Sequence, residues 1–376
     1  MNKVKHIFAI CLAFAFFCSC QGNKQGGVSP EGDTLALDYA QLLTIVDYDG
    51  YSVASIRDPW KKERNLHEYV LVPRDAQLPA DLPKGTLVRT PVSKAVIYTA
   101  VHSALVQEIG AGSQIGGVCD LQYIHLPFII NGVRNGSIKD CGDAMSPDLE
   151  RIIDLEPDAI MLSPFENSGG YGRVEELDIP IVECADYMET SALGRAEWMK
   201  FYGRLFGKAE TADSLFMTVR HSYMELKAQA ATAESKPTVI TDLKTGSVWY
   251  VPGGQSTQGK LWADANAVYP YADDSHSGSL ALSFEAVFDK GGHADIWVFR
   301  YNQPTPMTYR QLADDYHGNA ELKAYKEHRV YGCNTAYKLF YEETPFHPDR
   351  LLRDYIQICH PELDHGGLNY FERLSE

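Results

Sequence analysis

The sequence is short of positive charge and of long hydrophobic runs. Among 376 residues, 34 Lys and Arg stand against 50 Asp and Glu, so the formal net charge is -16. Proteins that bind the nucleic-acid backbone concentrate Lys and Arg, and this balance therefore excludes nucleic acid as the main partner. A single basic pocket for an anionic small ligand stays compatible with it. Beyond residue 17, no stretch is long and apolar enough to span a bilayer.

The usual sequence motifs of catalysis are also missing. The chain contains no G-x-S-x-G, H-E-x-x-H or P-loop pattern. Gly110–Gly116 approaches a dinucleotide-binding fingerprint, but Ile115 occupies the third glycine position. These absences favour a binding protein over an enzyme. The alternative is an exported metal-dependent hydrolase built on the acidic and His-rich loops around Asp264, Asp273-Asp274 and His276, although a solvated loop explains those residues more simply.

The eight cysteines contain no C-x-x-C pair, so we expect no metal–cysteine or redox site. Three of them, Cys11, Cys18 and Cys20, lie at the N-terminus. The other five are Cys119, Cys141, Cys184, Cys333 and Cys359. Cys333 with Cys359, or Cys119 with Cys141, could form disulfides in an oxidising compartment, and buried free thiols are the alternative.

The N-terminus has the organisation of an export signal. Lys3 and Lys5 precede an apolar run over residues 7–17, which would span only about 16 Å as a helix and is too short to cross a membrane. The sequence Phe17-Cys18-Ser19-Cys20 resembles a bacterial lipobox, which implies cleavage after residue 19 and lipidation of Cys20. A secretory signal without lipid is the alternative. We predict a signal peptide over 1–19 and a Gly-rich tether over 20–33. Loss of the signal deepens the formal charge to -18.

Short strands are predicted after the tether. Alternating apolar residues on both sides of Asp49-Gly50 predict a β-hairpin from Leu43–Val46 to Tyr51–Ile56. Two further strands are predicted over 68–72 and 85–90.

From residue 91 onward, predicted helices and strands alternate. The helices are expected over 93–109, 147–155 (capped by Ser146), 192–206, 209–232, 260–267, 283–290 (capped by Ser283), 312–315, 320–328 and 348–359. The strands are expected over 115–118, 159–162, 179–184, 238–243, 247–251, 295–299 and 329–333. Such alternation predicts mostly parallel sheets covered by helices. We therefore predict an α/β protein with two lobes, over 34–195 and 235–376, joined by long helices over 196–234; an extra β element occupies 34–90.

One unit occurs twice. Residues 146–162 and 282–299 each contain a capped helix with an early Glu, then an Asp and a buried strand. With the long helical region between them, these units resemble the ABC-transporter substrate-binding proteins that capture iron chelates, haem and cobalamin. Residues 90–118, 322–331 and 351–363 match other segments of that family in the same order, so the resemblance covers roughly residues 88–363.

The resemblance implies a non-enzymatic protein that captures a small-molecule metal chelate and holds no cofactor of its own. A ferric siderophore is the first expectation, and haem or cobalamin stay open. Glu150 and Glu285 would dock onto basic pockets of an ABC permease in the inner membrane; alternatively, each only stabilises a helix N-terminus. We expect a monomer in the cell envelope, lipid-anchored and facing the periplasm.

In a two-lobe α/β protein the ligand lies between the lobes, at loops that follow the carboxyl ends of strands. Guanidinium groups pair with carboxylates and aromatic rings cover apolar faces, which suits a flat, negatively charged chelate. Arg300 could instead bridge surface acids, and Trp249 could belong to the core. An axial ligand for haem would come from Tyr123, His125 or Tyr301. The expected ligand-binding residues are Lys94, Tyr123, Phe165, Trp249, Tyr250, Arg300, Tyr301 and Tyr341.

Overall fold

The computed structural model describes residues 32–166 and 170–376. The predicted signal peptide, the lipidation site Cys20 and most of the tether lie outside the described residues. No helix in the part of the chain that the structure describes is long and apolar enough to cross a membrane.

The chain first forms a five-stranded sheet. Its strands, in spatial as well as chain order, are β1 (Asp33–Thr34), β2 (Leu43–Tyr48), β3 (Tyr51–Arg57), β4 (Asn65–Pro73) and β5 (Thr86–Thr90). The predicted hairpin is confirmed, because Tyr48 pairs with Tyr51 across a two-residue turn in which Gly50 has a φ of 84°. Strand β5 runs parallel to β4, whereas the other neighbouring strands are antiparallel.

This N-terminal sheet shares its hydrophobic core with the lobe that follows it. Leu43, Ile45 and Ile56 alternate along β2 and β3 and are buried on one face. They belong to the same buried cluster as Trp198 and Phe201 from the connecting helices. The period-two pattern of the sequence therefore buries one face of the sheet against helices.

The N-lobe is built on a parallel sheet with the strand order β12-β11-β6-β7-β8. Its elements are β6 (Ala95–Ile97), α1 (Ala100–Glu108), β7 (Ile115–Val118), α2 (Pro127–Asn135), β8 (Lys139–Asp140), β9 (Gly142–Asp143), β10 (Ser146–Pro147), α3 (Leu149–Leu155), β11 (Ala159–Leu162) and β12 (Ile181–Glu183). Helix α2 is not predicted from the sequence.

Two predictions about this lobe were wrong. The helix expected over 93–109 is a strand, β6, followed by the shorter helix α1. Ala95–Ile97 is fully buried between two parallel neighbours, and a short apolar run of this kind does not distinguish a buried strand from a helix by its periodicity. The helix cap expected at Ser146 is instead Asp148, whose side chain accepts a hydrogen bond from the Arg151 amide. Ser146 lies in β10.

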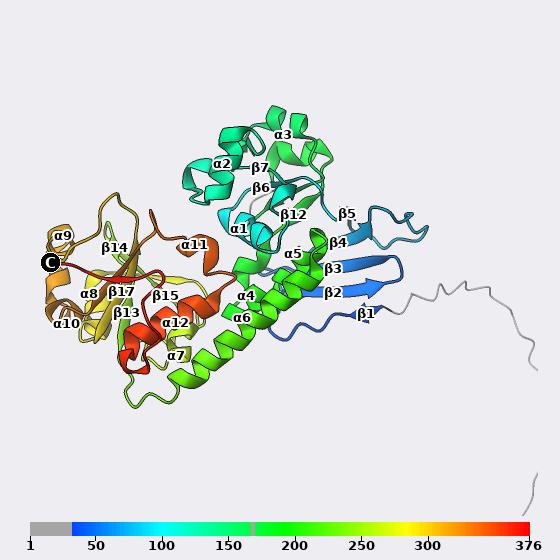
Figure 1. The fold of residues 1–376 in the computed structure, drawn as a ribbon. Coiled ribbons are helices and arrows are strands. Elements are labelled where there is room, and N and C mark those ends of the chain that lie inside the picture. Colours follow the sequence, from blue (N-terminus) through cyan, green and yellow to red (C-terminus); the bar gives the residue numbers. More distant parts are fainter. Residues whose placement is uncertain (1–31, 167–169) are drawn as a thin grey trace, which may run out of the picture. The chain divides into compact units, whose positions relative to one another are not determined.

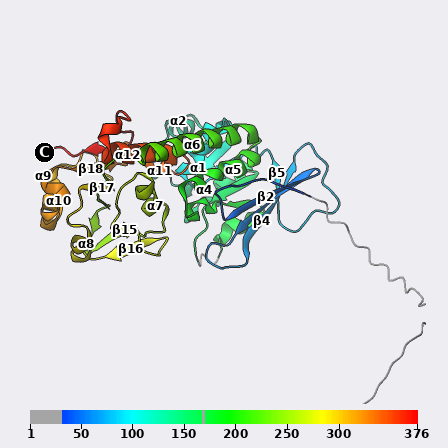
Figure 2. The same ribbon diagram turned by 90° about the horizontal axis from the view of Figure 1, so that it is seen from below.

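Three helices connect the lobes: α4 (Ala192–Glu197), α5 (Met199–Leu205) and α6 (Ala209–Ala230). The predicted break at Gly207 is confirmed, with a φ of 66° at that glycine. Helix α6 packs beside α5 and beside the C-terminal helix α12 (Pro348–Cys359), as Figure 1 and Figure 2 show. The predicted apolar stripe on α6 includes the buried residues Phe216, Val219 and Tyr223.

The C-lobe has one four-stranded sheet, in the order β13-β17-β18-β19, and one three-stranded antiparallel sheet, β14-β15-β16. Its strands are β13 (Val239–Thr241), β14 (Lys244–Thr245), β15 (Val248–Pro252), β16 (Ser279–Leu282), β17 (Ile296–Tyr301), β18 (Val330–Asn334) and β19 (Glu372–Arg373). Its helices besides α12 are α7 (Thr257–Asp264), α8 (Phe284–Gly291), α9 (Tyr309–Asp315), α10 (Lys323–Lys326) and α11 (Phe340–Glu343). The Ser283 cap is confirmed, since its hydroxyl accepts from the Ala286 amide. Each lobe contains a sheet with a parallel core next to helices, β12-β11-β6-β7-β8 in the N-lobe and β13-β17-β18 in the C-lobe, so the predicted α/β fold class is confirmed.

The Asp of the repeated unit has the same structural role in both lobes. Asp158, before β11, accepts hydrogen bonds from the backbone amides of Ser93 and Lys94, just before the neighbouring strand β6. Asp295, before β17, accepts from the amide of Thr238, just before the neighbouring strand β13. Each carboxylate therefore fixes the start of one parallel strand against the next.

All five cysteines of the described residues are free and buried.

Candidate ligand-binding cleft

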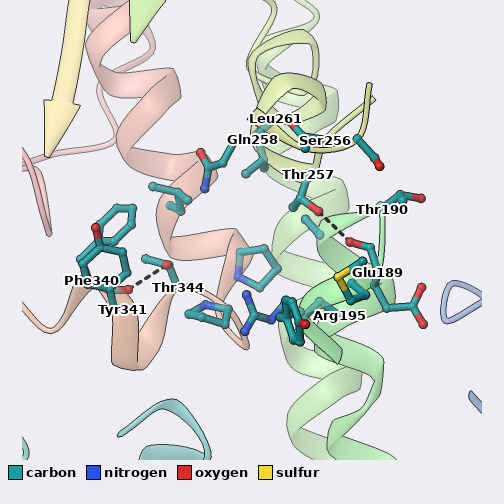
Figure 3. A pocket seen from close by; sticks show the side chains of 18 of the residues that line it. Glu189, Thr190, Arg195, Ser256, Thr257, Gln258, Leu261, Phe340, Tyr341 and Thr344 are labelled. Carbon is teal, nitrogen blue, oxygen red and sulfur yellow. Dashed lines mark hydrogen bonds between the residues drawn. The ribbon is translucent and has the colours of Figure 1, made fainter. Parts of the chain in front are cut away.

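A cavity of about 440 Å³, here called the cleft pocket, is lined by both lobes. The N-lobe contributes the segment after β12 and the start of α4, including Tyr187, Glu189 and Arg195. The C-lobe contributes Arg300 at the end of β17 and Tyr341 of α11, among others. Figure 3 shows these two walls facing the cavity. Small-molecule sites of α/β proteins lie at the carboxyl ends of strands, which is where this cavity is found.

A second cavity of about 550 Å³, the side pocket, adjoins the cleft pocket on the C-lobe. The side pocket is also lined by Tyr250, Tyr301 and Asp242. The residues common to both walls are Ser256, Gln258, Ser277, Gly278, Arg300 and Tyr341. Four of the expected ligand-binding residues, Tyr250, Arg300, Tyr301 and Tyr341, are therefore brought together around one continuous wall.

Arg300 is the central basic residue of the C-lobe wall. Its guanidinium forms an ion pair with Asp242, and its side chain is 28% exposed. The group also lies 5.6 Å from the centre of the Phe340 ring, a cation–π distance. Burial opposes the charge, but Asp242 and Tyr341 raise the pKa of Arg300 above its usual value, so the group stays cationic. A guanidinium with one edge bound to Asp242 retains other N–H groups for a ligand.

The tyrosines of the C-lobe wall differ in how exposed they are. Tyr250 and Tyr341 are 53% and 55% exposed. The hydroxyl of Tyr301 accepts a hydrogen bond from the Met307 amide 3.1 Å away, and burial raises the pKa of Tyr301. Tyr250 and Tyr341 are thus the most exposed tyrosines of the two pockets, ahead of Tyr187 at 38%.

Two glycines shape the loop that closes this wall. A side chain at Gly253 would clash with the carbonyl oxygens of His276 and Gly278, and one at Gly254 would clash with the carbonyl of Ala272. The Gly253-Gly254 turn after β15 therefore lets the loop at 272–278 approach closely. That approach places Ser277 and Gly278 on the wall of both cavities.

The other expected residues lie elsewhere. Phe165 lines a separate, mostly apolar cavity of about 330 Å³ in the N-lobe, together with Tyr98 and Tyr171. Tyr123 is 69% exposed and lies on the loop after β7, outside the walls of these cavities. The remaining two expected residues, Lys94 and Trp249, do not line the cleft pocket or the side pocket.

Lys94 lies at the amino end of β6, and its amine donates to the Leu155 carbonyl. The carboxyl end of the strand faces the opposite edge of the sheet, so Lys94 does not join the cleft. Trp249 is fully buried in the C-lobe core, where its indole N–H donates to the Thr241 carbonyl. Its ring packs against Trp297 at a centroid distance of 5.6 Å. The structure thus does not bring these two side chains to the cleft pocket.

Arg195, which lines the cleft pocket, is not among the residues predicted from the sequence, and neither are the residues that contact it. Asp186 follows β12 and is fully buried; it accepts hydrogen bonds from Arg195 Nε at 2.9 Å, His102 Nε2 at 2.8 Å and the Tyr202 hydroxyl at 2.7 Å. The other ring nitrogen of His102 contacts the Thr99 hydroxyl. The sequence signal for this cluster is the position of Asp186 just after the carboxyl end of a strand, where ligand sites of α/β proteins lie.

This buried cluster has strongly shifted proton affinities. Burial alone would lower the pKa of His102, but the nearby Cys184 thiol and Asp186 carboxylate raise it to about 10. Burial alone would raise the pKa of Asp186, but His102 and Arg195 hold it well below its usual range. At neutral pH the cluster therefore contains one carboxylate and two cations.

Several contacts join the two lobes beside the cavity. The Thr257 hydroxyl of α7 donates to the Glu189 carbonyl at 3.1 Å, as Figure 3 shows. Lys260 of the same helix donates to the Thr190 carbonyl at 2.8 Å. On another side of the lobe interface, His347 Nε2 lies 2.7 Å from the Glu108 carboxylate. These few polar contacts connect the lobes while leaving the cleft pocket between them.

The two expected docking carboxylates occupy equivalent positions. Glu150 is the second residue of α3, and Glu285 is the second residue of α8. Both are exposed. Hydrogen bonds with its own amide and with Ser283 lower the pKa of Glu285, so its carboxylate is ionised at neutral pH. Each helix is the one that precedes the strand of the repeated unit, so each lobe presents one such carboxylate.

The acidic loops proposed for a hydrolase are engaged in local contacts. Asp264 accepts from the Tyr223 hydroxyl at 2.5 Å and pairs with Lys227 at 2.7 Å. Asp274 pairs with His276 at 2.9 Å. Over 32–166 and 170–376, no group of three or more His, Cys, Asp or Glu side chains is placed to hold a metal ion.

Comparison with known proteins now assigns the chain. The family model of the periplasmic binding proteins matches residues 125–337, and the chain belongs to this family. The resemblance inferred from the repeated unit is thereby confirmed. Over 366 residues the chain is 24% identical to MJ0878, an uncharacterized lipoprotein of Methanocaldococcus jannaschii, covering 92% of this chain and 86% of the relative. It is also 24% identical over 320 residues to MJ0872, a second lipoprotein of that organism, covering 82% and 80%.

Three solved structures share the fold. A possible iron-binding periplasmic solute-binding protein of Staphylococcus epidermidis has a TM-score of 0.57 at 17% identity, covering 72% of this chain and 100% of the other. A periplasmic heme-binding protein of Pseudomonas aeruginosa has a TM-score of 0.58 at 14% identity, covering 76% and 99%. A periplasmic vitamin B12-binding protein of Vibrio cholerae has a TM-score of 0.53 at 13% identity, covering 73% and 99%.

The segment that forms the N-terminal sheet is at least partly aligned with one relative. The alignment with MJ0878 covers 92% of this chain, which leaves too few residues outside it to omit the whole of 33–90. At least part of the five-stranded sheet therefore lies within that alignment.

Proposed function

We propose that this protein is the substrate-binding lipoprotein of an ABC importer. It captures a metal chelate, in the first place a ferric siderophore, between its two lobes and delivers the chelate to the permease. Haem or cobalamin is the alternative ligand within the same function. The observation that carries this proposal is the cleft pocket, which combines Arg300 with open tyrosine rings at the carboxyl ends of the strands.

The chemistry of the wall supports a chelate as the ligand. Iron chelates and haem combine apolar or aromatic faces with anionic oxygens. Tyr250 and Tyr341 offer ring faces, and the Arg300 guanidinium offers paired N–H groups to an oxygen acceptor. The names of the structural neighbours, which include an iron-binding, a heme-binding and a vitamin B12-binding protein, support the same range of ligands.

Two observations support a location in the cell envelope: the sequence of the N-terminus and the names of two relatives. The lipobox-like sequence before Cys20 supports lipidation of that residue, and the relatives MJ0878 and MJ0872 are named lipoproteins. A lipid anchor followed by a tether would hold the lobes close to a membrane permease. We propose a periplasm-facing anchor and a monomeric protein, with Glu150 and Glu285 as the contacts to the permease.

The test is a ligand titration of purified protein without its signal peptide. Ferrichrome, ferric citrate, haem and cobalamin would each be added while calorimetry and tryptophan fluorescence are followed. We expect one of these classes to bind with a Kd in the micromolar range or tighter, and Arg300→Ala to weaken an anionic ligand at least 10-fold. No binding across the panel, together with metal-dependent hydrolysis of a test ester, would contradict the proposal.

A further inference from the structure

Arg195 extends from the N-lobe into the cleft pocket. It lies on α4, its side chain is 23% exposed, and its Nε donates to Asp186. Figure 3 shows the side chain projecting from its helix into the space between the two walls. Asp186 is bound through Nε, so the edge of the guanidinium between its two terminal nitrogens is a separate hydrogen-bonding edge.

The Arg195–Asp186 pair has a counterpart in the C-lobe. Asp186 lies three residues beyond β12, the edge strand of the N-lobe sheet, and Asp242 directly follows β13, the edge strand of the C-lobe sheet. Asp242 pairs with Arg300, as Asp186 pairs with Arg195. Each lobe therefore presents one arginine to the same cavity, held by an aspartate at the carboxyl end of an edge strand.

The acids on these walls are already bound within the protein. Among the described lining residues, Glu189 and Asp242 are the two that carry carboxylates. Glu189 accepts from the backbone amides of Gln41 and Leu42 and from the Trp198 indole, and Figure 3 shows its carboxylate pointing away from the cavity. Asp242 is paired with Arg300. The walls thus offer two guanidinium groups without an opposing carboxylate aimed into the space between them.

We propose that Arg195 is a ligand-binding residue, and that Arg195 and Arg300 bind a carboxylate-bearing ligand from opposite lobes. Asp186 and His102 are positioning residues in this arrangement, since they contact Arg195 or Asp186 and not the cavity. The inference rests on the proposed function in one respect, because it assumes that the ligand occupies the cleft pocket. It adds the chemical class of the ligand and a residue from the second lobe.

Charge-assisted hydrogen bonds explain why two arginines would select a carboxylate. A guanidinium binds a carboxylate through parallel N–H···O bonds, which a neutral hydroxamate chelate cannot replace in full. Two such groups on separate lobes also stabilise the closed conformation of the cleft, because both contacts form only when the two lobes approach the same ligand.

The experiment compares anionic and neutral probes by calorimetry. The anionic probes are citrate, ferric citrate and haem, whose propionates are carboxylates; ferrichrome is the neutral probe. We expect Arg195→Gln to weaken the anionic probe that the wild-type protein binds best by 10-fold or more, and to change ferrichrome affinity by less than 3-fold. The anionic affinity of the wild-type protein should also fall between 50 mM and 500 mM salt, and that dependence should shrink in the variant.

Two variants guard against a folding defect. Arg195→Lys keeps a cation beside Asp186 and should fold, yet a single amine cannot reproduce the fork, so we expect a 3- to 10-fold loss for the anionic probe. Arg173→Gln, which alters an arginine whose side chain is 80% exposed, should leave all affinities unchanged. Circular dichroism and Tm report whether each variant is folded.

The outcomes separate the inference from the proposed function. Equal weakening of anionic and neutral probes by Arg195→Gln, or no weakening of either, would overturn the inference while tight binding of a chelate still supports the function. Arginine-dependent binding of citrate without any chelate binding would support the inference and contradict the function. A wild-type protein that binds none of the anionic probes would overturn the inference.

Discussion

The two lobes hold their cleft arginines in different surroundings. In the N-lobe, Asp186 is fully buried and accepts from three side chains, which lie on three different helices, α1, α4 and α5. In the C-lobe, Asp242 is 19% exposed and pairs with Arg300 alone among the described side chains. The aspartate is thus fully buried in a network on one side of the cleft, and on the other side it forms a single, partly exposed ion pair.

This difference indicates how the two walls are used. A multiply bonded, buried group has one allowed position, so the N-lobe offers a preorganised contact at little entropic cost on binding. An ion pair near solvent is weak and can rearrange, so the C-lobe arginine can adjust to the ligand. We therefore interpret the N-lobe wall as fixed and the C-lobe wall as adaptable.

The largest expected effect is the loss of Asp186. Asp186→Ala leaves His102 and Arg195 buried without their carboxylate, and removing one partner of a buried ion pair costs about 3–5 kcal/mol. Asp242→Ala should cost about 1 kcal/mol or less, since its pair is partly exposed. Urea unfolding of both variants measures the two free energies of unfolding. Equal losses would contradict the distinction between the two walls.

A smaller effect concerns the dependence of stability on pH. The pKa of His102 is about 10 in the folded protein and about 6.5 in an unfolded chain. The stabilisation from its charged form is complete below the lower value and is lost as pH rises toward 10, by at most about 1.4 kcal/mol per pH unit. Relative to His102→Gln, the wild-type free energy of unfolding should therefore decrease between pH 7 and pH 10.

Tyr202→Phe is the matched control for this prediction. It removes a hydroxyl that donates to Asp186 and lies 3.1 Å from His102 Nε2, but it keeps the histidine and its Asp186 partner. It should therefore lower stability by about 1 kcal/mol while the decrease with pH persists. Urea unfolding at pH 7, 8, 9 and 10 gives the two curves. A difference between wild type and His102→Gln that stays constant across this range would show that His102 is not the titrating group.

The smallest expected effect on stability comes from the docking carboxylates. Glu150→Ala and Glu285→Ala each remove an exposed acid from the first turn of a helix, and each should lower the free energy of unfolding only slightly. Ligand affinity should stay unchanged, because neither residue lines the cleft pocket. Uptake of the bound chelate through the cognate permease in proteoliposomes should fall sharply in either variant.

Because the proposed docking uses one carboxylate from each lobe, we expect losses of similar size from the two substitutions. Glu225→Ala, at a residue of α6 whose side chain is 60% exposed, is the control and should transport normally. Normal transport by the Glu150→Ala, Glu285→Ala double variant would contradict the docking role.

Sequence reasoning predicted the parts that depend on local pattern. The hairpin at Asp49-Gly50, the break at Gly207 and the last helix over 348–359 follow from turn chemistry and helical periodicity, and all are present. The helix expected over 93–109 failed because Ala95–Ile97 is buried on both faces, a property set by neighbours distant in sequence.

The part of the site that directly follows strands was also predictable from the sequence, and the rest was not. Residues that directly follow a strand, such as Arg300 and Tyr301, were found by the rule of carboxyl ends. Arg195 escaped because it lies on a helix, and its approach to the cavity depends on Asp186 and His102, which are 84 residues apart in sequence. No local pattern encodes such a contact.

The most direct test of the account is the position of the metal in the loaded protein. Crystals grown with the tightest-binding iron chelate would be measured at the iron absorption edge, so that anomalous scattering locates the iron atom. The account predicts one strong peak in the cleft pocket, with the chelate contacting Arg300 and Tyr341. A peak outside the cleft pocket and the side pocket, or no bound iron in crystals of protein that binds the chelate in solution, would contradict it.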